Sequence, residues 1–496
     1  LTPKPGYTLD GIPANFFSYS GATTVTNSAN SGVVTVTFPF TPFTTQWYVF
    51  ATGSSDGNTG LTTAAPLATV DRALVRMRNE YSLATWPNKG LATEQEVYSD
   101  IKGTLNYISG FSNGMVSITG ANAYPAIELR GLGAGTNAGV LDATGKRRVL
   151  YISDSNNRVT LRQYLTLKGG DADNGGGAYI GGGGALTLDG GETGTITGNT
   201  AANSGGGVYI AANAAFTLSA GTVSSNVATV GGGGGVHIGA ATAAFTMHGG
   251  TITLNRAVWG GGVYNGGNFY LGAGTISANT VTSNGGGIYS GGTLTLSGGN
   301  VTSNTSSNTA GGGGGILVAG GTITMTGTTI STNKSMNGGG VYMNAGTFTM
   351  KGGTISGNTV TGSVYGSRGG GVAISGGSFI IESGNIYSNT AQAYGGGVYV
   401  EHGVSYPRAV FKMSKINITG TSHALANKAG QGPFNWTGAP TTISAADAGQ
   451  ALYIYAPLKK RNSTTALTDI VMYDSALSSD ASPTTANYAG TTMVWE

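Results

Sequence analysis

The chain has 496 residues, of which 89 are Gly, 9% are charged and none is Cys, and its formal net charge is +3. Disordered chains are usually rich in charge and poor in β-branched and aromatic residues, whereas here Val, Ile, Phe and Tyr recur at fixed places among the glycines, which indicates a repeated fold. The longest basic cluster is Lys459-Lys460-Arg461 and no run of about 20 apolar residues occurs, so neither nucleic-acid binding nor a membrane span is expected.

Residues 1–46, which we call the assembly arm, hold a strand-like run at 33–38, after which Pro39 and Pro42 interrupt the pattern. Such a segment is too short to build a core of its own, so its apolar side chains must pack elsewhere. We expect the arm either to fold back on its own chain or to add a strand to the C-terminal strands of another copy, giving a homo-oligomer or filament. The residues assigned to this contact are Val33, Phe38, Phe40, Phe43 and Trp495.

Residues 47–110 begin with Tyr-Val-Phe-Ala-Thr-Gly at 48–53, Asp-Gly-Asn-Thr-Gly at 56–60 and Pro-Leu-Ala-Thr-Val-Asp-Arg-Ala-Leu at 66–74. The last run places Leu67, Val70 and Leu74 on one face of a short helix. This order of strand, turn and amphipathic helix resembles the entry segment of secreted pectate-lyase-like β-helix proteins. The resemblance implies that residues 47–110 form an N-terminal cap, with the short helix closing the end of the fold.

Residues 111–174 hold short runs in which apolar and polar residues alternate, such as Val116-Ser117-Ile118, and are predicted to form irregular rungs of the same fold. At their end, Asp171, Asp173 and Asn174 place three oxygen-bearing side chains close together. Calcium binds such ligands, so a calcium site between rungs is one interpretation and a solvated turn is the other. No other cofactor is expected.

Residues 175–402 repeat four landmarks in a fixed order. A Gly triplet before Val or Ile and usually Tyr (205–209) is followed by an apolar-x-apolar run (216–218) and a Thr-Ile-Ser run (275–277), with an Asn three residues after its Ile or Val. The distance between successive Asn residues varies from 24 to 31 residues, while the offsets within each repeat stay nearly constant. The predicted Asn column comprises Asn199, Asn226, Asn255, Asn279, Asn304, Asn333, Asn358 and Asn389.

Constant offsets joined by variable gaps indicate strands joined by loops of differing length. Each repeat holds three short strands with a period of two, and no single repeat can close a core, so successive repeats must stack about 4.8 Å apart. The sequence therefore predicts an all-β fold, a right-handed parallel β-helix with three-strand rungs. Equivalent residues would form ladders, with the Asn amides bonding between rungs.

The runs Ile-Ser-x-Asn and Gly-Gly-Gly-Val-Tyr resemble the repeats of the polymorphic outer-membrane protein family, whose marks are Gly-Gly-Ala-Ile and Phe-x-x-Asn. The resemblance covers about residues 170–400 and implies a surface-exposed β-helix associated with adhesion. Two features depart from the family pattern, since a third Gly replaces Ala and Ile or Val replaces Phe.

After about residue 403 the Gly triplets stop, and aromatic strand-like runs follow at 452–455, 470–473 and 492–495. Open solenoid ends expose unpaired strand edges that invite stacking between molecules. Residues 403–496 are therefore predicted to form a β-rich C-terminal cap.

Acidic residues decide between an enzyme and a binding protein. Glycoside hydrolases and lyases need clustered carboxylates, yet the only acids within residues 175–400 are Asp189, Glu192 and Glu382. His237 and His248 lie in one repeat without a nearby carboxylate, which favours surface or ladder positions. We therefore expect a non-catalytic protein, with a polysaccharide lyase or glycoside hydrolase as the alternative.

Two further patterns carry alternatives. The recurrent Tyr after the Gly triplet is interpreted as a stacking ladder, with a sugar-binding strip as the alternative. Stacked Thr/Ser runs resemble those of ice-binding solenoids, although β-propensity explains the same residues. The Tyr positions are Tyr179, Tyr209, Tyr264, Tyr289, Tyr342 and Tyr399.

The polar, uncharged composition and the start at Leu1 favour a processed protein located outside the cell or on its surface. We expect it to act in adhesion or in building an external layer or filament, with a glycan or a host or cell-surface molecule as a candidate ligand.

Overall fold

The protein is described from a computed structural model that divides into two units, Leu1–Thr44 and Thr45–Glu496. Residues 127–191, 193–307, 312–361, 368–392 and 394–400 are described without interruption. Shorter described pieces are 24–27, 29, 34–37, 46–50, 55, 57–58, 64–68, 70, 72–74, 97–106, 116–119, 410–413, 417–418, 428–429, 452–454 and 493–495.

The first unit holds an antiparallel strand pair. β1 (Thr24–Asn27) pairs with β2 (Val34–Thr37), with Thr24 opposite Thr37. The strand-like run of the assembly arm is thus present as β2, paired within the arm itself. Val33, Phe38, Phe40 and Phe43 lie outside the described residues.

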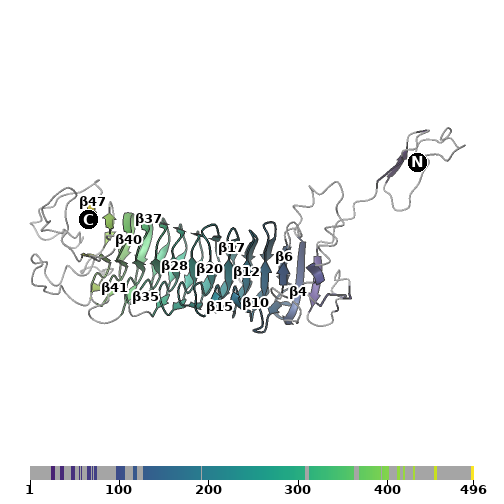
Figure 1. Ribbon diagram of the computed structural model, residues 1–496, viewed down its shortest axis with the longest axis horizontal. Helices are drawn as coiled ribbons and strands as arrows, with labels where there is room; N and C mark the ends of the chain where they lie inside the picture. Colours follow the sequence, from purple (N-terminus) through teal and green to yellow (C-terminus); the bar gives the residue numbers. More distant parts are fainter. Residues whose placement is uncertain are drawn as a thin grey trace, which may run out of the picture. The chain divides into compact units, whose positions relative to one another are not determined.

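The second unit is a parallel β-solenoid, as the repeat pattern predicted, and its coils follow one another in chain order (Figure 1). Three sheets run along it, of 12, 10 and 23 strands, and we call them the Tyr sheet, the narrow sheet and the wide sheet. The Tyr sheet contains β5 (Val116–Ile118), β8 (Leu150–Ile152), β12 (Ala178–Ile180), β16 (Val208–Ile210), β20 (Val236–Ile238), β24 (Val263–Asn265), β28 (Ile288–Ser290), β32 (Ile316–Val318), β36 (Val341–Met343), β39 (Val372–Ile374), β42 (Val398–Val400) and β46 (Leu452–Ile454).

The narrow sheet consists mostly of two-residue strands. It contains β11 (Asp171–Asn174), β15 (Thr200–Ser204), β19 (Val227–Ala228), β23 (Arg256–Ala257), β27 (Thr280–Val281), β31 (Thr305–Ser306), β35 (Lys334–Ser335), β38 (Thr359–Val360), β41 (Thr390–Ala391) and β45 (Lys428–Ala429).

The wide sheet has two strand columns that long strands connect. Its first column contains β6 (Ile127–Gly131), β9 (Arg158–Leu161), β13 (Ala185–Asp189), β17 (Ala215–Ala220), β21 (Ala244–Met247), β25 (Asn268–Leu271), β29 (Thr293–Leu296), β33 (Thr322–Met325) and β43 (Val410–Met413). Its second column contains β7 (Gly139–Asp142), β10 (Leu165–Lys168), β14 (Thr195–Thr197), β18 (Thr222–Ser224), β22 (Thr251–Thr253), β26 (Thr275–Ser277), β30 (Asn300–Thr302), β34 (Thr329–Ser331) and β44 (Asn417–Ile418). Both columns share β4 (Val97–Asn106), β37 (Thr347–Ser356) and β40 (Ser378–Tyr387), and β3 (Gln46–Phe50) and β47 (Met493–Trp495) complete the sheet.

One coil shows how the sequence maps on the sheets. In the coil 208–228, β16 belongs to the Tyr sheet, β17 and β18 to the wide sheet, and β19 to the narrow sheet. The three strands predicted per repeat are present, and the two-residue strand after the Asn is a fourth that the repeat pattern did not reveal.

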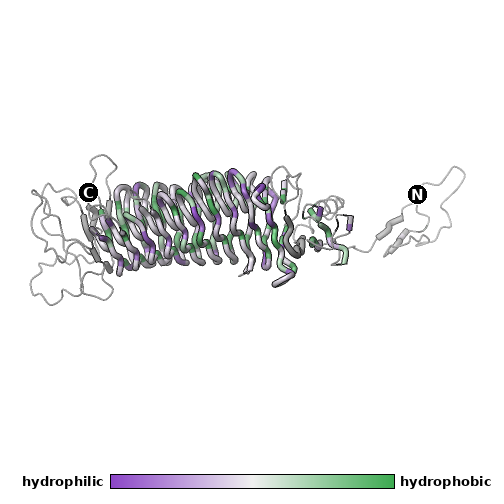
Figure 2. Tube along the Cα trace, turned by 90° about the horizontal axis from the view of Figure 1, so that it is seen from below, coloured by the Kyte–Doolittle hydropathy of each residue, from purple (hydrophilic) through white to green (hydrophobic). Residues whose placement is uncertain are grey.

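In most strands of the described coils, apolar side chains point inward at alternate positions and fill the solenoid. Phe216, Phe245 and Phe269 stack in the core with ring centroids 5.1 and 4.7 Å apart, and each is at most 2% exposed. Hydrophobic and hydrophilic segments accordingly alternate along the successive coils (Figure 2). Burying such a ring stabilises the fold by about 1.5–3 kcal/mol relative to leaving it in water.

The beginning of the predicted amphipathic helix is helical at Val70, Arg72, Ala73 and Leu74. Of these, Val70, Ala73 and Leu74 are buried, and Leu67 just before them donates its N–H to the carbonyl of Tyr48 in β3 (2.8 Å). Capping of the solenoid end by this helix stays a prediction. No helix among the described residues is long and apolar enough to cross a membrane.

At the other end, two strands of the predicted C-terminal cap are paired in cis. β46 extends the Tyr sheet in parallel to β42, and β47 pairs antiparallel with β43, with Trp495 opposite Phe411. The reversed β47 occupies the outer edge of β43, the last parallel strand in its column. The edge that was expected to receive a strand from another copy is thus already paired at this point.

Candidate functional site

The structure brings all eight predicted Asn residues together in one column, at the turn between the wide and narrow sheets. Each of the eight side chains is 0% exposed. The residue before each Asn has a positive φ of 53° to 64°, and this single left-handed residue makes the turn between the two sheets. The left-handed conformation costs a non-glycine residue about 1–2 kcal/mol. These left-handed residues are Gly198, Ser225, Leu254, Ala278, Ser303, Thr332, Gly357 and Ser388.

The Asn column is held by a repeating set of hydrogen bonds, which Asn226 illustrates. Its Oδ1 accepts from the backbone N–H of Asn199 (3.1 Å) and from the Nδ2 of Asn199 (3.0 Å). Its Nδ2 donates to the carbonyl of Ile196 (3.0 Å) and to the Oδ1 of Asn255 (3.0 Å). Both lone-pair directions and both amide hydrogens are therefore used within the protein, and no capacity remains for a ligand.

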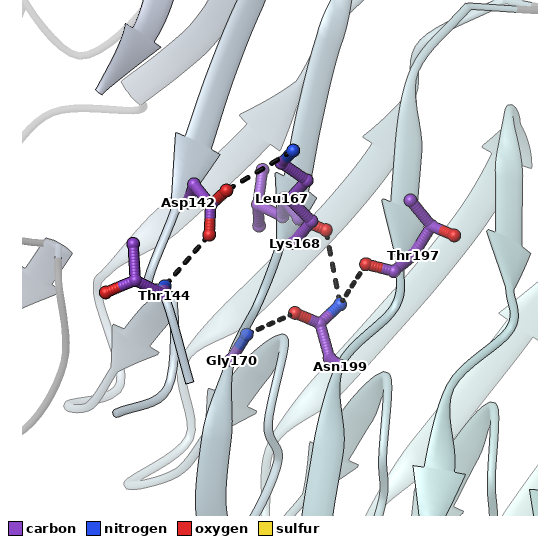
Figure 3. Close-up of polar contacts among 7 residues, drawn as sticks. All are labelled: Asp142, Thr144, Leu167, Lys168, Gly170, Thr197 and Asn199. Carbon is purple, nitrogen blue, oxygen red and sulfur yellow. Dashed lines mark hydrogen bonds and ion pairs between the residues drawn. The ribbon is translucent and has the colours of Figure 1, made fainter. Parts of the chain in front are cut away.

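Asn199 is the first residue of the Asn column, and its amide bonds to backbone groups of the preceding coil (Figure 3). The Oδ1 of Asn199 accepts from the backbone N–H of Gly170 (2.9 Å), the residue at the Asn position one coil earlier. Its Nδ2 also donates to the carbonyls of Leu167 (3.2 Å) and Thr197 (3.1 Å). The column is thus closed by backbone groups at this end.

The third Gly of each triplet packs against the Asn column. Gly205, first in its triplet, has a φ of 69°. A Cβ on the third residue, Gly207, would lie 2.5 Å from the carbonyl oxygen of Gly235 and 3.0 Å from the Nδ2 of Asn226. This close approach of the neighbouring coil explains why the third position holds Gly.

The outer face of the Tyr sheet carries a column of stacked rings. Tyr151, Tyr179, Tyr209, His237, Tyr264 and Tyr289 follow one another with centroids 4.5 to 5.4 Å apart and ring planes within 19° of parallel. The Arg148 guanidinium lies over Tyr179 at 4.9 Å from its centroid. Since neighbouring rings occupy both faces of each inner ring, stacking of sugar rings on those faces is blocked, and the geometry favours a structural ladder. In the coils after Tyr289, the equivalent register positions are occupied by Leu317, Tyr342, Ala373 and Tyr399.

His237 takes a Tyr position in this ring column. Burial lowers the pKa of His237 from 6.5 to about 4, although its Nδ1 lies 3.1 Å from the Gly232 carbonyl, a contact that raises the pKa. Below about pH 6.5 the unfolded chain binds a proton here that the folded protein does not accept until about pH 4. The contribution of neutral His237 to folding stability is therefore complete above about pH 6.5 and is lost as the pH decreases from about 6.5 to about 4.

We expect the His237→Tyr variant to lack this part of the acid sensitivity. Between pH 7 and pH 4 the wild type should lose about 3 kcal/mol more unfolding free energy than the variant. Urea unfolding followed by circular dichroism at both pH values measures this difference. Equal losses in the two proteins would show that His237 does not titrate as its burial indicates.

The second candidate histidine lies elsewhere. His248 is exposed just after β21 and meets Tyr270 edge to face, with centroids 5.9 Å apart. His237 and His248 thus do not form one site. No Asp or Glu occurs between Glu192 and Glu382, so neither histidine has an acidic partner within this stretch of the chain.

The predicted Thr/Ser runs do form columns in register on the wide sheet. Thr222 pairs with Thr251 and Thr251 with Thr275, and all three side chains are half-buried. A neighbouring column contains Ser224, whose Oγ donates to the Oγ1 of Thr197 (3.1 Å). Part of the hydroxyl capacity is therefore used between coils.

Charged side chains gather instead on the first coils of the wide sheet. Arg162 joins three coils: its Nε donates to the Oε1 of Glu128 (2.6 Å), and its Nη1 pairs with the Oδ2 of Asp189. Glu128 is only 6% exposed. In the second strand column of the same sheet, Lys168 Nζ lies 3.3 Å from Asp142 Oδ2 (Figure 3). The sequence did not reveal the Arg162 cluster, because its members lie 34 and 27 residues apart in the chain.

The three candidate calcium ligands lie in one strand, β11. In β11, Asp171 and Asp173 are exposed, whereas the Oδ1 of Asn174 already accepts from the N–H of Ser204 (3.2 Å). No group of three or more His, Cys, Asp or Glu side chains suited to a metal ion is present in the part of the chain that the structure describes. A calcium site stays a prediction, and calcium takes about six to eight oxygen ligands, more than these three side chains supply.

Compared with protein-family models, with curated proteins and with solved structures, the chain matches none of them.

Proposed function

We propose that this protein is a non-catalytic extracellular surface or structural protein that acts in adhesion or builds an external layer or filament. The observation that supports this most is the use of polar groups in the regular coils. The buried Asn amides are consumed by bonds between coils, and the outer faces carry Thr, Ser and stacked rings without a single acid from residue 193 to residue 381. Such a surface suits contact over a large area better than bond-breaking chemistry.

A polysaccharide lyase or glycoside hydrolase is the runner-up, and the Arg162 cluster is its best location. Glycosidases need one carboxylic acid and one free carboxylate, whereas Glu128 and Asp189 both pair with the same guanidinium. Both carboxylates are therefore engaged in ion pairs, and neither is left as a free acid or base for this chemistry.

The deciding assay mixes the full-length protein with a uronic-acid glycan and follows the length of the polymer. We expect no depolymerisation. Cleavage that disappears in both Glu128→Gln and Asp189→Asn, with the fold retained, would overturn the non-catalytic proposal.

Self-association is tested by removing residues 1–44, which form a unit of their own and end before β3. We expect the full-length protein to form oligomers or filaments in analytical ultracentrifugation, and the truncated protein to be monomeric with an unchanged β spectrum. Assembly of the truncated protein, or a monomeric full-length protein at high concentration, would contradict the role of the assembly arm.

Ice binding remains a second candidate because the Thr/Ser columns are in register over successive coils. Asn300 and Tyr387 interrupt them, which weakens a lattice match. Thermal hysteresis of freezing in a solution of the full-length protein would support this candidate, and its absence would remove it.

A further inference from the structure

The narrow sheet exposes a column that is one side chain wide. In its two-residue strands the first side chain faces outward and the second is buried, as for exposed Arg256 and for Ala257, which is 3% exposed. Lys334 and Ser335 repeat this arrangement in β35, where Ser335 is 1% exposed. The outer face of this sheet is therefore a single file of residues along the solenoid axis.

Basic residues recur at every third position of the backbone register in this sheet. The register runs through Arg256, Thr280, Thr305, Lys334, Thr359, Thr390 and Lys428, so two Thr residues separate each cation from the next. With about 4.8 Å per coil, the cations are about 14 Å apart. This exceeds the Debye length of about 8 Å in physiological salt, so the row costs little through mutual repulsion.

These cations lack acidic neighbours. Among the described residues, Arg256 and Lys334 form no ion pair, and no Asp or Glu occurs from residue 193 to residue 381. The contrast is Lys351 on the wide sheet, whose Nζ lies 3.8 Å from the Oε2 of Glu382. The charge of the file is thus available to an anion from outside.

Exposed apolar side chains flank the first cation. Leu254, two residues before Arg256, is 61% exposed, and Trp259, three residues after it, is 38% exposed. Val230, 61% exposed, lies three residues beyond Val227, the register partner of Arg256. Indole rings present an apolar face that suits the C–H face of a sugar, and a guanidinium suits its carboxylate.

We propose that the narrow sheet binds a linear acidic polysaccharide lying along the solenoid axis, with Arg256 and Lys334 contacting its anionic groups and Trp259 packing on a sugar ring. This inference rests on the proposed function and names the class of ligand. A file one side chain wide fits a chain molecule better than a membrane plane. Cations about 14 Å apart are too sparse for duplex DNA, which carries one charge about every 1.7 Å.

The experiment uses the full-length protein, a homopolymer of uronic acid and the same polymer with its carboxylates methyl-esterified. We expect calorimetry to show binding of the acid form that weakens with salt, and binding of the ester at least tenfold weaker. The R256Q/K334Q double variant should lose at least tenfold in affinity and show a shallower salt dependence. Trp259→Ala should lose affinity while keeping the salt dependence.

Lys351→Gln is the matched control, because it removes an exposed cation from the wide sheet; its affinity should stay within twofold of wild type. Circular dichroism verifies that each variant keeps its fold. Absence of binding, wild-type affinity in R256Q/K334Q, or equal affinity for duplex DNA or anionic vesicles would overturn the inference. Cleavage of the polymer would contradict the proposed function instead, so the two failures are distinguishable.

Discussion

Asn279→Ala is expected to lower the free energy of unfolding by about 4 kcal/mol, because four hydrogen bonds worth about 1 kcal/mol each are lost. The Oδ1 of Asn279 accepts from the N–H and the Nδ2 of Asn255, both at 3.0 Å. Its Nδ2 donates to the carbonyl of Ile252 (3.0 Å) and to the Oδ1 of Asn304 (2.9 Å). The side chain is fully buried, so water cannot replace these partners without entering the core.

Urea unfolding followed by circular dichroism measures this loss, and Asn268→Ala is the matched control. Asn268 is an exposed Asn in β25 whose Nδ2 donates to the carbonyl of Ala241 (2.8 Å), so its removal should cost less than about 1 kcal/mol. Asn279→Asp separates hydrogen bonding from volume, since it keeps the shape but replaces the donor by an oxygen facing two other oxygens. A stable Asn279→Asp variant would contradict the assigned role of the amide.

Gly262→Ala is expected to destabilise the protein by about 3 kcal/mol, at the upper end of the usual cost of overpacking. The added Cβ would lie 2.8 Å from the carbonyl oxygen of Gly287, 2.8 Å from the Cγ2 of Ile276 and 3.0 Å from the Nδ2 of Asn279. The carbonyl belongs to the next coil, so relief requires two coils to separate.

The matched control for this change is Gly291→Ala, in the turn after β28. Its Cβ would meet only the carbonyl oxygen of Asn265 at 3.9 Å, and its φ is not positive. The melting temperature should therefore change little, whereas that of Gly262→Ala should fall by several degrees. Equal effects of the two substitutions would show that the close approach between coils does not limit the third triplet position.

The fold followed from the sequence because the repeats carry constant offsets. The distance from Phe216 to Leu218 and on to Val223 fixes which faces point inward, and loops absorb the differences in repeat length. The Asn column was predictable for the same reason. The hydrogen bonds between hydroxyls of neighbouring coils, such as that from Ser224 to Thr197, could not be predicted, because they depend on side-chain rotamers.

The narrow sheet was not predictable by the same means. A strand such as Arg256–Ala257 has two residues, and two residues cannot display a period of two. The register of this strand depends on the turn at left-handed Leu254 and on the buried Asn255 that follows it. Leu is not a residue that indicates a left-handed turn in a sequence. The row of cations therefore became visible in the structure alone.

The register between coils has a further consequence for how such a chain can change over generations. Hydrogen-bonded Asn residues lie 24 to 31 residues apart, yet every inner coil presents the same set of partners to the coil before and after it. Duplication or loss of one whole coil by unequal recombination would rejoin equivalent surfaces at the seam and leave the Asn column continuous. Loss of half a coil would place strands against turns. The gene can thus change the length of the solenoid in whole steps, while the two ends stay as they are.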